Sequence, residues 1–132
     1  MMHAISSVGL GLIQQSEGFR SEPTKLSDDS WVVGYSHVRV GEPGDAVSQS
    51  EAADLLTIDV APVERVLNAL VTQPLTQNQF DALVSFAFSI GLETFAGSQV
   101  LRRVNAGDFV AAACAMDAWR RAEVDGELEI SP

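Results

Sequence analysis

Apolar positions near the N-terminus repeat with the period of an α-helix. We expect Val8, Leu12 and Ile13 to face inward. Ser6 or Ser7 can cap this helix, because a serine hydroxyl accepts a hydrogen bond from a free backbone N–H of the first turn. The apolar pattern stops at Glu17-Gly18, so we expect the helix to end there.

The pattern changes between residues 19 and 47, where proline, glycine and aspartate interrupt short apolar pieces. The most strand-like of these pieces is Trp31-Val32-Val33. Because the pieces are short and turn residues separate them, we expect a small antiparallel sheet of two or three strands.

Helical spacing returns after residue 47 and continues to about residue 122. Pro62 predicts a break or kink near Ala61, and Gly91 predicts a helix end. Four residues are predicted to cap the starts of helices: Ser48, Thr76, Ser98 and Asp108. The first two begin capping boxes, because a Glu or Gln follows three residues later.

A helix, a small sheet and then several helices predict an α+β domain with the sheet on one side. We place this domain at residues 1–122. Residues 123–132 have no apolar periodicity and four acidic side chains among ten, which indicates an acidic tail or the start of a linker.

The chain is acidic, with eight basic and eighteen acidic residues and a formal charge of -10. Such a surface disfavours nucleic acids and anionic membranes as partners. No signal peptide and no run long enough for a membrane span is visible, which favours a cytoplasmic domain. Cys114 is the only cysteine, and we expect it to be buried in an alanine-rich helix.

Glu17 stands at the predicted helix end, immediately before the predicted sheet, where a carboxylate can lie at the lip of a cleft. The segment from Ser16 to His37, with Leu75–Phe86 and Leu101–Asp108, resembles the phage-type lysozymes of glycoside hydrolase family 24. The likeness runs from about Ser6 to Trp119. It implies a two-lobed muramidase fold, with a peptidoglycan-binding cleft between a hairpin lobe and a helical lobe.

The family motif has a Glu, an Asp nine residues later, a Thr six beyond that, and then Gly-x-Gly-His. Glu17 matches the general acid, but Leu26 stands at the Asp position and Val32 at the Thr position. Ser36 replaces the second glycine, while Gly34 and His37 are retained. Glycoside cleavage needs two carboxyl groups, so these departures imply little or no activity.

Turn residues Asp28 and Asp29 lie close to Leu26, but catalysis tolerates misplacement of about 1 Å poorly, so we do not expect either to replace the missing Asp. The resemblance also makes Tyr35, His37 and Ser89 cleft residues. Ser89 stands where the lysozymes usually carry Asn. The family's final Gly-Leu…Arg-Arg helix, which packs beside the first helix, has no counterpart in this sequence.

We expect His37 to form a hydrogen bond within the hairpin, and no second His or Cys stands at metal-ligand spacing. Neither a metal nor another cofactor is expected. Leu26 and Val32 either project toward a partner or fill the hairpin's own small core, and the sequence leaves both readings open.

Residues 100–105 and 112–121, together with Leu26, are similar to the muramidase-like domain of the SpmX-type polarity proteins of stalked alphaproteobacteria. That resemblance implies a cytoplasmic localisation and interaction module, tethered to the membrane through segments absent from this sequence. The implied partners are a polar scaffold protein and a sensor histidine kinase, and a second copy of the chain is a further candidate.

Two hypotheses follow. The first is a catalytically degenerate scaffold module that binds proteins. The second is an active or weakly active muramidase that hydrolyses peptidoglycan glycan strands with Glu17 as its general acid.

Overall fold

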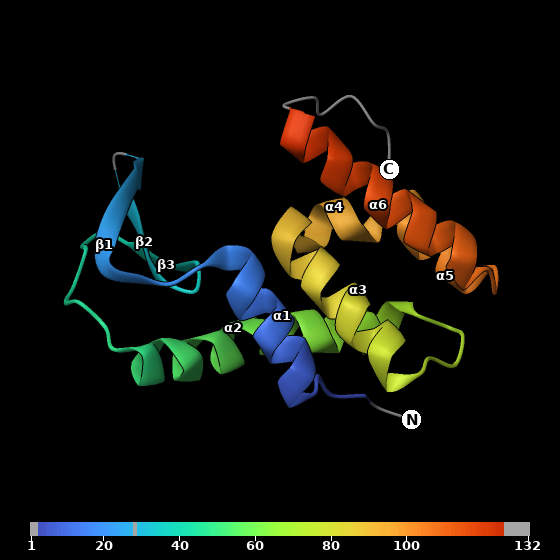
Figure 1. Ribbon diagram of the computed structural model, residues 1–132, viewed down its shortest axis with the longest axis horizontal. Helices are drawn as coiled ribbons and strands as arrows, with labels where there is room; N and C mark the ends of the chain where they lie inside the picture. Colours follow the sequence, from blue (N-terminus) through green and yellow to red (C-terminus); the bar gives the residue numbers. More distant parts are fainter. Residues whose placement is uncertain (1–2, 28, 126–132) are drawn as a thin grey trace.

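The computed structural model describes residues 3–27 and 29–125 and shows a sheet lobe beside a helical lobe (Figure 1). The elements in chain order are α1 (Ser7–Glu17), β1 (Arg20–Ser27), β2 (Ser30–Gly34), β3 (His37–Val40), α2 (Gln49–Leu70), α3 (Gln77–Ile90), α4 (Leu92–Ala96), α5 (Gln99–Asn105) and α6 (Phe109–Asp125). The predicted α+β class with a segregated sheet is confirmed.

The sheet is antiparallel and has the order β1-β2-β3. Its central strand carries Val33, which is fully buried and packs into the core. Val32 pairs with Val38 of β3 in the regular part of the ladder. The pairing of β1 with β2 shifts between Lys25 and Ser27, so Leu26 lies at a bulge near the hairpin turn.

Helix α1 is fixed at its N-terminus by its own cap and by a buried carboxylate. The Ser6 hydroxyl accepts a hydrogen bond from the backbone N–H of Gly9, as predicted. The Asp81 carboxylate, from α3, accepts hydrogen bonds from the backbone N–H and the hydroxyl of Ser6 and from Gln77. Gly9 lies so close to Asp81 that an added Cβ would stand 2.6 Å from its Cγ.

Helix α2 runs beneath both lobes and connects them (Figure 1). It contacts β2 and β3 in the sheet lobe and α3 and α4 in the helical lobe. Its capping box, Ser48 with Glu51, is present as predicted, and the backbone N–H of Ser48 holds the pKa of Glu51 below its usual value. Buried apolar residues along α2, such as Leu56 and Leu67, join one core shared by both lobes.

A break near Ala61, one of the two alternatives predicted from Pro62, is wrong, because α2 is continuous from Gln49 to Leu70. A proline removes one backbone N–H from the helix ladder and leaves the carbonyl four residues earlier, that of Ile58, without its partner. Ile58 and Pro62 are both exposed, so water can hydrate that carbonyl and the helix persists.

Three further differences concern the C-terminal half. Helix α4, between Gly91 and Ser98, was not predicted from the sequence. Cys114 is exposed rather than buried, because α6 turns Ala112 and Met116 toward the core. Helix α6 continues to Asp125, past the boundary expected at residue 122, and residues 126–132 lie outside the described part of the chain.

Candidate functional site

Glu17 is the last residue of α1 and lies half-buried at the junction with the sheet lobe. Its Oε1 accepts a hydrogen bond of 2.6 Å from the hydroxyl of Ser36, in the turn between β2 and β3. Within residues 3–27 and 29–125, no basic side chain pairs with Glu17. The predicted general acid is therefore held by a neutral hydroxyl.

Ser36 occupies a backbone conformation that favours glycine. Its φ is 63°, and no other non-glycine residue in the described part of the chain has a positive φ. A side chain in the left-handed region costs roughly 1–2 kcal/mol. The sequence marked Ser36 only as a departure from a glycine position, and its bond to Glu17 could not be predicted because the two residues are far apart along the chain.

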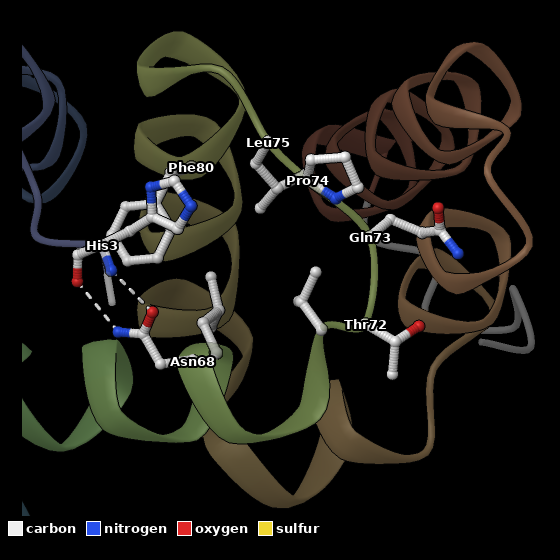
Figure 2. Close-up of a pocket in the computed structure, with 9 residues that line it drawn as sticks. His3, Asn68, Thr72, Gln73, Pro74, Leu75 and Phe80 are labelled. Atoms are coloured by element: carbon white, nitrogen blue, oxygen red, sulfur yellow. Dashed lines mark hydrogen bonds between the residues drawn. The ribbon is translucent and has the colours of Figure 1, made fainter. Parts of the chain in front are cut away.

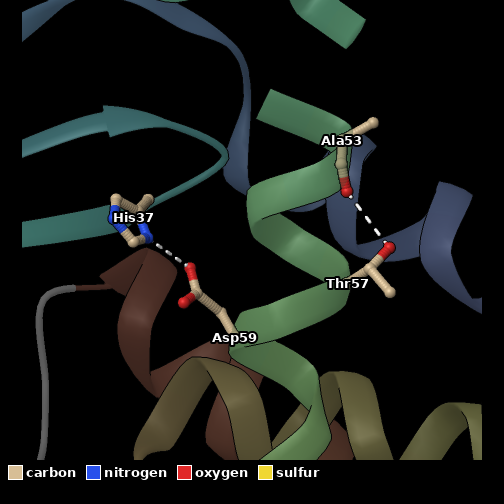
Figure 3. A network of polar contacts seen from close by, with 4 residues as sticks. All are labelled: His37, Ala53, Thr57 and Asp59. Carbon is tan, nitrogen blue, oxygen red and sulfur yellow. Dashed lines mark hydrogen bonds and ion pairs between the residues drawn. The ribbon is translucent and has the colours of Figure 1, made fainter. Parts of the chain in front are cut away.

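His37 binds the sheet lobe to the long helix beneath it. Its Nδ1 lies 2.8 Å from Oδ2 of Asp59 in α2, and both side chains are about one quarter exposed (Figure 3). The sequence predicted a hydrogen bond within the hairpin, but the partner comes from α2. Asp59 carried no motif signal, so sequence reasoning missed it.

The position at which the resemblance implies a second carboxylate holds an exposed apolar side chain. Leu26 is 58% exposed at the β1 bulge, whereas Val32 is only 8% exposed in β2. Leu26 therefore faces solvent, whereas Val32 is covered and lies between Thr24 of β1 and Val38 of β3 in the sheet. Asp29 is exposed in the turn, and Asp28 lies outside the described residues.

Exposed valines extend this apolar character along β3. Val38 and Val40 lie on the same face of the strand and are 51% and 75% exposed. Tyr35, expected to line the cleft, is instead buried in the core, where its ring lies 5.7 Å from that of Phe19. Tyr35 thus stabilises the lobe from within.

Glu17 also lines a groove between α1, α3 and α6, which we call the three-helix groove. Its volume is about 930 Å³. The expected cleft residue Ser89 lines it from α3, with its hydroxyl bonded to the carbonyl of Phe86. Asp117 and Arg120 line it from α6, so the groove holds a second carboxylate that the sequence analysis did not single out. Asp117 pairs with Arg121 at 3.3 Å, and both side chains are largely exposed.

A smaller hollow of about 400 Å³ lies away from Glu17, beside the end of α2. Figure 2 shows the ring of His3 stacked on Phe80, with the backbone of His3 bonded to the side chain of Asn68. Leu75 and Pro74 also line this hollow (Figure 2). The residues that line this hollow do not include Glu17, and the contacts of His3 hold the N-terminal segment on α2 and α3.

Two features are absent from residues 3–27 and 29–125 of the chain. This part of the chain contains no group of three or more His, Cys, Asp or Glu side chains that could hold a metal ion. Nor does it contain a helix that is both long and apolar enough to cross a membrane.

Phage endolysins are among the proteins whose sequences are similar to this chain. The chain is 38% identical to the endolysin of Acyrthosiphon pisum secondary endosymbiont phage 1, over 96% of this chain and 86% of that protein. It is 35% identical to the endolysin of Salmonella phage P22, over 96% and 90% of the two chains.

Among solved structures, the muramidase domain of SpmX from Asticaccaulis excentricus is similar, with a TM-score of 0.84 and 49% identity. The similarity covers 89% of this chain and 80% of that one. The sequence profile of the phage lysozyme family matches residues 14–129. The resemblance noted in the sequence is thereby confirmed, and the chain belongs to the phage lysozyme family.

Proposed function

We propose that this chain is a catalytically degenerate lysozyme domain that acts as a protein-interaction module. The observation that carries the proposal is Leu26, an exposed leucine where the family needs its second carboxylate. Glycoside hydrolysis uses one carboxyl group as acid and a second as nucleophile or base. Positioned acid–base groups contribute roughly 10²–10⁴-fold each, so a domain with Glu17 alone retains little turnover.

Exposed apolar side chains on the sheet lobe support the interaction role. Leu26, Val38 and Val40 are each more than half exposed, and a partner protein would cover them. Resemblance to the SpmX-type proteins, supported by the similar muramidase domain, suggests a cytoplasmic scaffold role with a polar scaffold protein and a sensor histidine kinase as partners.

One observation favours a second candidate, an active muramidase. Asp117 and Glu17 line the same groove from different helices, and the curated relatives are endolysins. In that case Asp117 would act as the second carboxylate and peptidoglycan would be the substrate. Its pairing with Arg121 weighs against this role, because the carboxylate is already engaged.

The two candidates separate in a hydrolysis assay. The purified domain is incubated with peptidoglycan, and new reducing ends are followed beside Glu17→Gln and Asp117→Asn variants. We expect no turnover above the Glu17→Gln background. Turnover that both substitutions abolish would establish the muramidase and overturn the degenerate-domain proposal.

A gain-of-turnover pair tests the role of Leu26 directly. Leu26→Asp restores a carboxylate at the family position, and we expect it to raise turnover at least about tenfold, which is less than the roughly 10²–10⁴-fold contribution of a well-positioned acid–base group. Val38→Asp is the matched control, because it adds the same charge at another exposed site of the sheet lobe. Equal behaviour of the two variants would show that position 26 is not the missing catalytic position.

A further inference from the structure

Each helix around the three-helix groove presents a stripe of residues at helical spacing. On α6 the stripe includes positions 109, 113, 116 and 120, and on α3 it includes positions 82, 86 and 89. Positions 12 and 16 continue it on α1. Side chains three and four residues apart lie on one face of a helix, so three helix faces converge on one groove.

These three faces do not cover one another. Helix α6 packs mainly against α5, and α1 packs mainly against α3, so the groove between α1 and α6 stays open. Its walls combine apolar and polar side chains; of the apolar ones, Phe86 and Phe109 are half-buried and Leu12 is 47% exposed. Polar groups, including Glu17, lie among them.

We propose that the three-helix groove binds one amphipathic helix of a basic partner protein. The inference rests on the proposed function, because it names the kind of partner and the surface that binds it. Parallel ridges of side chains at three- and four-residue spacing are what a further helix packs into. A helix about 10 Å across fills 930 Å³ with about two turns, so the groove has the capacity for a short helical contact.

Charge decides between a basic partner and a second copy of this chain. The chain carries -10, so two copies repel each other while a basic protein is attracted. Glu17 is half-buried in the groove, and among residues 3–27 and 29–125 its hydrogen-bond partner is the hydroxyl of Ser36. A lysine or arginine on the bound helix would supply the cation that Glu17 lacks within the described residues, and an acidic residue would face Arg120.

Trp119 provides a signal for binding. Its ring lies 6.1 Å from that of Phe86, which lines the groove, so a helix in the groove changes the surroundings of both rings. The Trp31→Phe substitution leaves Trp119 as the only tryptophan. The probe is a synthetic amphipathic peptide about four turns long, with leucines on one face and lysines on the other, long enough to form a helix when bound.

We expect saturable binding of this peptide, with a change in Trp119 emission. Ala113→Arg places a long cationic side chain in the groove and is expected to weaken binding about tenfold, as loss of a central contact does. Val110→Arg is the matched control on the same helix, since Val110 is 77% exposed and does not line the groove. A second pair is Leu12→Ser in the groove and Val8→Ser outside it, and circular dichroism checks that every variant is folded.

Equal weakening by the groove and control variants, or equal binding of a peptide with the same residues in scrambled order, would overturn the inference. So would a concentration-dependent dimer in light scattering that Ala113→Arg abolishes, since the groove would then bind a second copy. Peptidoglycan turnover is measured separately. If the peptide does not bind and peptidoglycan is not cleaved, only this inference is wrong. If peptidoglycan is cleaved, the proposed function is wrong.

Discussion

At the scale of single residues, Ser36 combines a strained backbone with a favourable side-chain contact. Its positive φ costs roughly 1–2 kcal/mol relative to glycine, and its hydroxyl donates a 2.6 Å hydrogen bond to Glu17. A hydrogen bond to a charged group contributes about 1.5–3 kcal/mol. The contact therefore offsets the strain and fixes the orientation of the carboxylate at the end of α1.

Two substitutions separate the strain from the contact. Ser36→Ala removes the hydroxyl but keeps a Cβ at positive φ, so we expect it to lower the free energy of unfolding by about 1.5–3 kcal/mol. Ser36→Gly removes both, and should be about 1 kcal/mol more stable than the alanine variant. Urea denaturation followed by circular dichroism measures both values. If the alanine variant were as stable as the glycine variant, the backbone of Ser36 would not be strained.

The sequence marked Glu17 and His37 because a motif with fixed spacing carried them, and each forms its hydrogen bond to a residue of another element. Their partners, Ser36 and Asp59, could not be predicted. Each lies about twenty residues from the residue it binds, and only the folding of the turn over α1 and α2 brings the pairs together. Motif spacing identifies a residue type at a position, whereas contacts between elements depend on the tertiary fold.

At the scale of elements, α2 keeps its helical path despite Pro62. The proline lies on the exposed side, so the helix loses a hydrogen bond without burying an unsatisfied carbonyl. The buried side of the helix supplies the compensating contacts, through residues such as Val60 and Val63. Burial of one face thus outweighs the local preference of one residue.

Pro62→Ala should stabilise the domain. An interior proline destabilises a helix by about 3 kcal/mol relative to alanine. Alanine also makes the unfolded chain more flexible, which lowers this gain in stability by up to about 1 kcal/mol. We expect the free energy of unfolding to rise by the difference, about 2–3 kcal/mol, measured by urea denaturation. Arg65→Ala, at another exposed position of α2, is the control and should change it by less than about 0.5 kcal/mol. A destabilised Pro62→Ala variant would show that the proline contributes packing.

Helix starts were predictable because their signals are local. Ser6, Ser48, Thr76 and Ser98 each accept a hydrogen bond from the backbone of their own first turn. Helix α4 and the exposure of Cys114 depend on something else. Phe95 of α4 is completely buried, so tertiary packing holds a segment too short to be stable alone, and the side of α6 that faces solvent depends on α5.

At the scale of the molecule, one acidic chain is divided into two lobes over a common helix. Helix α2 contacts both lobes, and the His37–Asp59 pair joins the sheet lobe to it. Acidic and basic side chains pair as His37–Asp59 and Asp117–Arg121, but the net charge of the chain is -10. Repulsion among unpaired carboxylates therefore acts on the whole fold.

Salt should stabilise the domain for this reason. Raising sodium chloride from 0.01 M to 0.15 M shortens the screening length from about 30 Å to about 8 Å, which weakens repulsion across the molecule. We expect the free energy of unfolding to increase by on the order of 1 kcal/mol, measured by urea denaturation. Potassium chloride should act equally, since the effect is one of screening. A decrease in stability would show that the attractive pairs dominate.

Gly9 has a consequence for the far end of its helix. No side chain fits between Gly9 and Asp81, so α1 can approach α3 this closely only because residue 9 is a glycine. Gly9 lies about 12 Å along the helix from Glu17. Because a helix is stiff, adding that methyl would tilt α1 and displace its last carboxylate, although no atom near Glu17 had changed. The mouth of the three-helix groove can therefore be widened or narrowed by mutation at a position remote from it.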